Sequence, residues 1–317
     1  MPKAYVMILL AFLFSTFCLV RINHWLKRAR SKSTNTVGLY TEPTNYTHHQ
    51  RIFCLVLTTS DNHRTRALAV NRTWGKRCEG LTFATNSPLE RNLNTIFAGV
   101  TNQSKRFITH RLFATLRIVY FRYHSLYDWF YIADDDTYAI IENLRHFLRD
   151  KDPYSFPKYY GFGYGPTDIQ YKGENLTFAH GGAGFILGRT ALKRLVEVGY
   201  ISASKGRCHP LLLTERHDEH ADVNIGLCLL KLGIKIETFQ DEYGRETFLK
   251  ENPIHVLNML QTNRESYEQR WASYRDVIHH PESRYEMLSS HAISFHYMSP
   301  GDMYFVDFLL YNLRRGD

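Results

Sequence analysis

The feature that most constrains this chain is an apolar segment, residues 129–133, that runs directly into Asp134, Asp135 and Asp136. Such a segment is typical of a strand buried inside a sheet. Three like charges at the end of a buried strand cost free energy unless a cation neutralises them. Carboxylates bind Mg²⁺ and Mn²⁺, which also bind phosphate oxygens. The pattern therefore predicts a divalent metal that joins the strand end to a diphosphate. The alternative is an acidic turn, with Asp136 or Thr137 capping the next helix.

Further apolar runs alternate with amphipathic segments along the chain. The runs that predict strands are residues 52–57, 94–100, 185–187 and 234–239. Helical periodicity is found in residues 64–74, 107–123, 140–148 and 192–196, after Asp222, and through Tyr304, Phe308 and Leu309. Strands alternating with helices indicate an α/β fold with a mainly parallel sheet, which we expect to form one domain over residues 50–317.

The N-terminus predicts a membrane anchor. Residues 4–20 are uncharged and mostly apolar, and a group of basic residues follows them without a clear cleavage site. We expect a short cytoplasmic tail and signal-anchor helix over residues 1–25 and a polar lumenal stem over residues 26–49. A cleaved signal peptide is the alternative. The basic residues after the segment would by themselves place the body in the cytosol.

Two other patterns favour a secretory lumen for the body. Sequons for N-glycosylation begin at Asn45, Asn71, Asn102 and Asn175. The cysteines outside the apolar segment are even in number and fit two disulfides in an oxidising compartment; they are Cys54, Cys78, Cys208 and Cys228. The sequence contains no CxxC pair, so a metal site formed by these cysteines is less favoured than disulfides.

Composition excludes some classes of protein. With 44% hydrophobic and 22% charged residues, the chain is neither disordered nor collagen-like. The net charge of +8 is spread along the chain rather than gathered in one run. Because no nucleic-acid-binding motif accompanies it, we expect no nucleic-acid partner.

Three further patches carry chemistry, each with a plainer alternative. The glycines after His180 allow backbone N–H groups to approach a ligand, or form a tight turn. Asp222 lies near the first turn of an apolar helix, where a carboxylate can accept a proton or simply offset the helix dipole. His296 stands among aromatic residues and by itself is more typical of a core histidine.

These stretches and several others keep one order and spacing. They comprise Thr73-Trp74, Arg77-Cys78, residues 129–138, 181–185 and 191–194, Asp222, Gly226, Cys228, and residues 244–248, 294–297, 303–304 and 310–314. Together they resemble the glycosyltransferase family 31 enzymes, and most closely the core 1 β1,3-galactosyltransferases. The resemblance covers nearly the whole body of the chain.

The resemblance implies a GT-A type nucleotide-diphospho-sugar transferase fold that uses Mn²⁺. It implies inverting transfer of galactose from UDP-galactose to the 3-hydroxyl of GalNAc on Ser or Thr of glycoproteins. It also implies a single-pass type II protein of the Golgi membrane with a lumenal catalytic domain, which overrules the flanking charges, and it allows a homodimer.

The resemblance also assigns roles to residues. Asp134, Asp136 and His296 are expected to bind the metal, and Asp222 is the expected catalytic base. The expected donor contacts are Thr58, Asp135, Gly181, Gly182 and Tyr297, and Glu246 is the expected acceptor contact. The expected disulfides are Cys54–Cys78 and Cys208–Cys228.

Some positions depart from the family pattern. Ala221 stands where the family usually has Glu, and Ile132 stands where Lys is frequent. Residues 246–250 read ETFLK in place of the family's ETFHP, and a cysteine pair before residues 294–297 is missing. These departures leave open another β1,3-glycosyltransferase, for example with a GlcNAc donor. They also leave open a catalytically weak paralogue that binds UDP-sugar or glycoprotein as a partner.

Overall fold

The computed structural model describes residues 50–87, 92–104, 107–165, 167, 169–201, 205–208, 220–262 and 288–314. The predicted anchor (residues 1–25), the predicted stem (residues 26–49) and the sequon at Asn45 lie outside the described residues. No helix in the described part of the chain has the length and apolar character that a membrane span requires.

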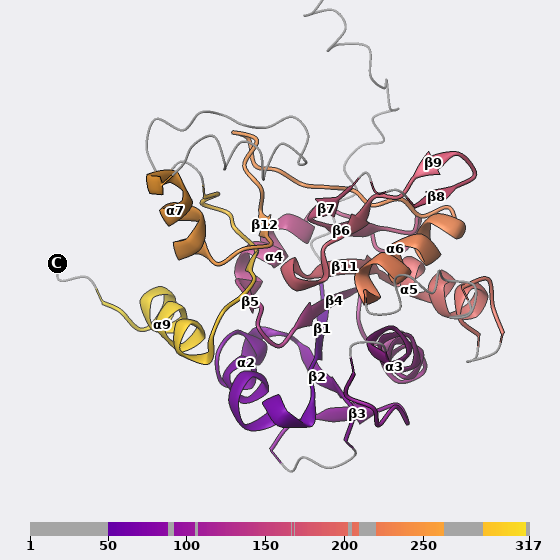
Figure 1. Ribbon diagram of the computed structural model, residues 1–317, viewed down its shortest axis with the longest axis horizontal. Helices are drawn as coiled ribbons and strands as arrows, with labels where there is room; N and C mark the ends of the chain where they lie inside the picture. Colours follow the sequence, from indigo (N-terminus) through magenta and orange to yellow (C-terminus); the bar gives the residue numbers. More distant parts are fainter. Residues whose placement is uncertain are drawn as a thin grey trace, which may run out of the picture. The chain divides into compact units, whose positions relative to one another are not determined.

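A six-stranded sheet in the order β3-β2-β1-β4-β11-β6 organises the fold (Figure 1). Its strands are β1 (Ile52–Leu57), β2 (Gly80–Thr85), β3 (Thr95–Phe97), β4 (Trp129–Asp134), β6 (Tyr159–Gly161) and β11 (Phe185–Gly188). Strands β1 to β4 pair in parallel, whereas β11 pairs antiparallel with both of its neighbours. The α/β class and the mainly parallel sheet expected from the sequence are confirmed.

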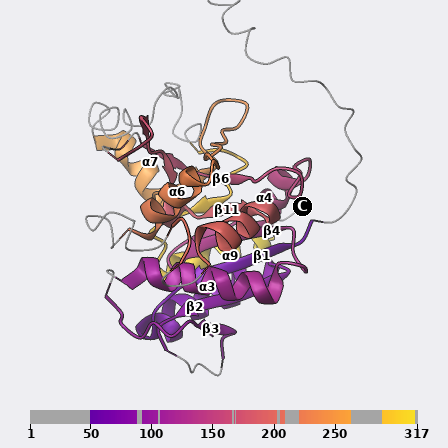
Figure 2. The same cartoon turned by 90° about the vertical axis from the view of Figure 1, so that its right-hand side faces the viewer.

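Helices cover both faces of this sheet. On one face lie α2 (Leu68–Arg72) and α4 (Ile141–Leu148), and on the other lie α3 (Ile108–Tyr123), α5 (Arg189–Arg194) and α6 (Ala221–Lys231) (Figures 1 and 2). Successive β1 side chains alternate between two apolar clusters, so Cys54 packs with α2 and α4 while Leu55 packs with α3 and α6. The strand is apolar at every position because both of its faces are buried.

A second, three-stranded sheet has the order β12-β13-β5. It joins β12 (Phe248–Leu249), β13 (Ser294–Phe295) and β5 (Tyr138–Ala139). Helices α7 (Pro253–Thr262) and α9 (Pro300–Tyr311) follow β12 and β13. Two short antiparallel pairs complete the strands: β7 (Gly163–Tyr164) with β10 (Phe178–Ala179), and β8 (Gln170–Tyr171) with β9 (Glu174–Asn175).

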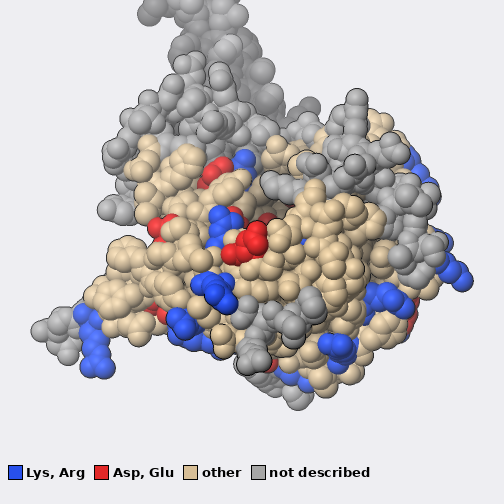
Figure 3. Space-filling view, turned by 60° about the horizontal axis from the view of Figure 1, so that its bottom comes forward, with Lys and Arg blue, Asp and Glu red and all other residues tan. Residues whose placement is uncertain are grey.

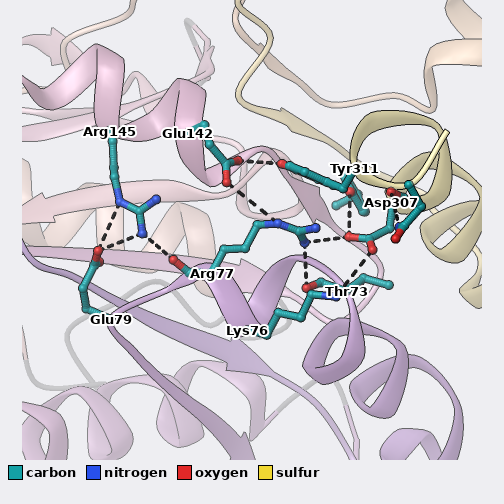
Figure 4. A network of polar contacts seen from close by, with 10 residues as sticks. Thr73, Lys76, Arg77, Glu79, Glu142, Arg145, Asp307 and Tyr311 are labelled. Carbon is teal, nitrogen blue, oxygen red and sulfur yellow. Dashed lines mark hydrogen bonds and ion pairs between the residues drawn. The ribbon is translucent and has the colours of Figure 1, made fainter. Parts of the chain in front are cut away.

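A polar network holds α9 against the rest of the fold (Figure 4). Arg77 donates a hydrogen bond to Asp307 Oδ1 at 2.6 Å, and its guanidinium lies 3.4 Å from the centre of the Tyr311 ring. The Tyr311 hydroxyl donates to Glu142 Oε2 of α4 at 2.6 Å. Because Arg77 adjoins Cys78, which is bonded to Cys54 of β1, these contacts connect α9 to the central sheet.

Both expected disulfides form, Cys54–Cys78 and Cys208–Cys228. Of the predicted sequons that are described, Asn102 and Asn175 are exposed, and Asn71 is half-buried on α2.

One sequence prediction of local structure was wrong. Residues 234–239 form no strand: within the described residues they make one isolated bridge, from Glu237 to Tyr160, and the apolar pattern reflects packing of Ile234 into the core. The predicted helix over residues 64–74 is confirmed as far as Arg72, and the backbone leaves the helical region at Thr73 (φ −108°, ψ −112°). Strand β2 was not predicted, since its buried threonines obscure the apolar pattern.

The packing of α6 on β10 depends on a glycine. A Cβ atom on Gly226 would lie well inside van der Waals contact with Phe178 Cβ. We expect Gly226→Ala to lower the free energy of unfolding by about 1–3 kcal/mol through overpacking, measured by urea denaturation. Gly301→Ala in α9 is the matched control, because its Cβ would meet only Ser299 Oγ, at 3.7 Å. Equal unfolding free energies for the two variants would contradict this interpretation.

Candidate active site

The acidic residues lie at an edge of the main sheet where three strands bring polar groups together. In the parallel β1–β4 pair Leu57 is opposite Asp134, so Thr58 lies beside the next carboxylate. The Thr58 hydroxyl donates to Asp135 Oδ2 at 2.6 Å. Strand β11 runs the other way, so the glycines that precede it reach the same edge. The strand directions thus place Thr58, the acidic residues and the glycines together.

The small sheet adds His296 to this edge. Residues 294–295 pair with β5, and Met298 N–H donates to the Asp136 carbonyl at 2.9 Å. His296 Nε2 then lies 3.2 Å from Asp136 Oδ1, while Nδ1 lies 3.2 Å from the Lys250 carbonyl. Because the carbonyl and the carboxylate both accept, the protonated ring donates from Nδ1 to Lys250 and from Nε2 to Asp136. Loss of the Nε2 proton leaves a lone pair directed at the carboxylates, where a metal could take it.

Asp134, Asp136 and His296 form a group that fits a divalent ion. One ligand atom from each lies within 4.8 Å of the others. Two carboxylates and one imidazole suit a metal such as Mn²⁺. Burial and the neighbouring charge of Asp136 raise the pKa of Asp134 to about 7, so a bound cation would favour its charged form. The acidic-turn alternative is wrong, because β5 follows Asp136 and α4 begins only at Ile141.

A glycine lets His296 lie against the backbone. The Thr137 hydroxyl donates to the Gly182 carbonyl at 2.9 Å, which fixes the glycine turn beside the acidic residues. A Cβ atom on Gly182 would overlap the His296 ring. Position 182 therefore has to be glycine if His296 is to keep its place.

Asp222 faces a cavity of about 240 Å³ beside this group. Its Oδ2 accepts the Gly181 N–H at 3.0 Å, and its Oδ1 accepts the Val223 N–H at 2.9 Å. It lies in the first turn of α6, whose cap is His220, so Asp222 is not the helix cap. The cavity is lined by Leu57, Ile108, Leu112, Ile132, Asp134, His180, Gly181, Gly182, Phe185, His220, Ala221, Asp222 and His296.

Sequence reasoning missed two residues of the site. Arg66 Nη1 lies 3.6 Å from Asp135 Oδ1 and 3.4 Å from Asp136 Oδ2, but nothing in its segment distinguishes it from neighbouring arginines. His180 lines the cavity, burial lowers its pKa to about 4, and its Nδ1 has no hydrogen-bond partner among the described residues. The position of His180 directly before the glycine cluster could have identified it from the sequence.

The predicted site residues do not all meet. Tyr297 is 57% exposed and stacks on the His296 ring at 3.8 Å, so it lies at the site's edge. Glu246 does not line the cavity; it accepts a hydrogen bond from Gln240, and burial raises its pKa to about 7. Its role toward an acceptor stays a prediction. Ile132 and Ala221, which depart from the family pattern, both line the cavity.

Charged side chains are unevenly distributed on the face shown in Figure 3. Acidic and basic side chains adjoin one another near its middle, and other Lys and Arg side chains lie in separate small groups around them. This face therefore carries no continuous basic patch in the part of the chain that is described.

A family model described as Fringe-like matches residues 47–283. The chain belongs to the Fringe-like family. Glycoprotein-N-acetylgalactosamine 3-beta-galactosyltransferase 1 of Xenopus laevis is 31% identical over 264 residues, which cover 83% of this chain and 67% of that protein. Chondroitin sulfate synthase 3 of Mus musculus is 30% identical over 199 residues, or 56% of this chain and 21% of that protein.

Among solved structures, the Fringe-like chain is similar to a glycosyltransferase involved in the glycosylation of the major capsid of PBCV-1. The TM-score is 0.40 at 11% identity, over 82% of this chain and 100% of that one. A score this low adds nothing to the assignment. The family alone makes the chain a glycosyltransferase, which implies a sugar-nucleotide donor and a glycan acceptor.

Gly182→Ala tests the metal group. The added methyl would displace the His296 ring, so we expect Mn²⁺ binding to weaken by at least about tenfold, measured by isothermal titration calorimetry. Gly301→Ala, far from the acidic residues in sequence and with room for a Cβ, is the control and should bind like the wild type. Unchanged Mn²⁺ affinity in Gly182→Ala would argue against His296 as a ligand.

Protons should compete with the metal. The pKa of Asp134 is raised to about 7 by burial, and that of His296 is also raised, because the hydrogen bond and charge of Asp136 outweigh its burial. Both groups must lose a proton to bind a metal, so Mn²⁺ affinity should fall as the pH drops from about 8 to about 6. Titrations in buffers of different ionisation enthalpy measure the protons released; no proton release at pH 6 would contradict the assignment.

Proposed function

We propose that the chain transfers galactose from UDP-galactose, with inversion, to the 3-hydroxyl of GalNAc linked to Ser or Thr of glycoproteins. The site would be of GT-A type and use Mn²⁺. The observation that supports this most is that Asp134, Asp136 and His296 meet at the wall of the cavity that Asp222 faces. The similarity to the Xenopus galactosyltransferase supports the choice of donor and acceptor.

The chain's own residues have distinct roles in this proposal. Asp134, Asp136 and His296 would hold Mn²⁺, which supplies positive charge to the departing diphosphate when bound. The Thr58–Asp135 pair and Arg66 would orient the nucleotide side of the donor.

Asp222 is the proposed base. The two backbone N–H groups on its carboxylate fix its orientation without neutralising it. It would remove the proton from the acceptor hydroxyl as that oxygen attacks the anomeric carbon. The bond from this carbon to the UDP oxygen breaks as the new bond forms on the opposite face, so an α-linked donor gives a β-linked product.

Ile132 and Ala221 motivate a second candidate. Both lie in the cavity, where the family usually carries Lys and Glu, so the wall near Asp222 is less charged than the family pattern implies. A less charged wall would suit another sugar donor, such as UDP-GlcNAc, or would leave a chain that binds UDP-sugar with little transfer.

We also propose that the chain works in the Golgi lumen as a type II membrane protein. The proposal rests on the apolar segment at residues 4–20, the sequons and the two disulfides.

Two substitutions test the assignment of base and metal ligands. Incubated with UDP-galactose, Mn²⁺ and a GalNAc-peptide, the wild-type chain should add one hexose, detected by mass spectrometry. Asp222→Asn should keep Mn²⁺-dependent UDP binding but lower transfer by roughly 10²-fold or more. Asp136→Ala should lose both. Asp61→Asn, an exposed carboxylate earlier in the chain, is the control.

The outcomes separate the candidates. Wild-type turnover by Asp222→Asn would exclude it as the base. Transfer from UDP-GlcNAc in preference to UDP-galactose would establish the second candidate. Mn²⁺-dependent UDP binding with no product from either donor would identify a binding partner.

A further inference from the structure

The structure buries a cation that the proposed mechanism does not use. Arg111 lies in the first turn of α3 and is only 3% exposed. Its Nε and Nη1 atoms have no hydrogen-bond partner among the described residues. Burying a guanidinium with two unpaired nitrogens costs free energy unless opposite charges lie near it, so its surroundings have to explain its presence.

Arg111 lies on the side of α3 that faces the candidate active site. Ile108 and Leu112 of the same helix line the cavity that contains Asp134. Residues three apart share a helix face, so Arg111 lies on the same face of α3 as Ile108. Arg111 itself does not line the cavity.

The carboxylates at the end of β4 supply negative charge that acts on Arg111. Burial lowers the pKa of Arg111, while the charges of Asp134 and Asp135 favour its charged form. Arg66 also pairs with the acidic residues, but its side chain is 43% exposed, so water and salt screen its charge. The charge of Arg111 acts through the protein interior, where electrostatic interactions are stronger.

We infer that Arg111 is a positioning residue for the donor: its buried charge offsets part of the negative charge of Asp134, Asp135 and Asp136, so that a sugar nucleotide's diphosphate is attracted to the site. The inference rests on the proposed metal–diphosphate site and adds to it a buried residue that does not line the cavity.

Loss of the Arg111 charge should change the affinities for the metal and for the diphosphate in opposite directions. Removing a buried cation leaves the acidic residues more attractive to a bare dication, so metal alone should bind more tightly. The same removal should weaken binding of the anionic diphosphate. A residue that only supported the fold would instead weaken both ligands together.

The experiment uses the purified full chain in mild detergent with four variants. Arg111→Met removes the charge, Arg111→Gln does so with a polar side chain, and Arg111→Lys keeps it. Arg117→Met is the matched control, because Arg117 is exposed on the same helix. Calorimetry measures Mn²⁺ binding alone and UDP binding at saturating Mn²⁺, and thermal unfolding measures stability.

We expect Arg111→Met and Arg111→Gln to bind Mn²⁺ several-fold more tightly and UDP roughly tenfold more weakly than the wild type. Arg111→Lys should restore both affinities to within about twofold, and Arg117→Met should not change them. If either neutral variant folds and has wild-type affinity for both ligands, the inference is wrong. It is also wrong if both affinities fall together and Arg111→Lys does not restore them. Failure of the wild type itself to bind UDP with Mn²⁺ would overturn the proposed function, and this inference with it.

Discussion

The end of β4 is the constraint around which this protein is arranged. The strand is buried between β1 and β11, and its apolar sequence leads without a break into three carboxylates. Adjacent carboxylates at the end of a buried strand repel one another, and different side chains contact them. A hydroxyl from Thr58 binds the middle carboxylate, Arg66 reaches two of them from the surface, and His296 faces Asp136. Burial and the charge of Asp136 still raise the pKa of Asp134, so its charged form is not fully stabilised by these contacts. A divalent cation is the natural complement of that negative charge.

Strand direction explains how distant parts of the chain reach this point. The parallel β1 brings Thr58, and the antiparallel β11 brings the glycine turn that contacts Asp222. The small sheet carries His296 next to Asp136, although 160 residues separate them in the sequence. Helix α9 follows directly, and the contacts of Arg77 and Tyr311 hold it to the core. The candidate active site therefore depends on packing far from the carboxylates themselves.

Membership in the Fringe-like family fixes the class of chemistry, whereas the cavity walls bear on the choice of sugar. Ile132 and Ala221, two of the departures from the family pattern, lie in the cavity wall with Asp134 and Asp222. The group that fits a metal is complete beside them.

The sequence by itself determined the alternation of strands and helices and the acidic strand end, and it named candidate site residues whose roles stay predictions. Those features are local: an apolar run shows that a strand is buried, and adjacent residues such as Asp134, Asp135 and Asp136 remain adjacent in any fold. Tertiary structure decided what no local pattern records. It showed that Ile234 packs without forming a strand, that Glu246 does not line the cavity, and that Arg66 pairs with Asp135 and Asp136. These facts depend on pairing between segments far apart in the chain, and an arginine's charge has no defined partner until that pairing exists.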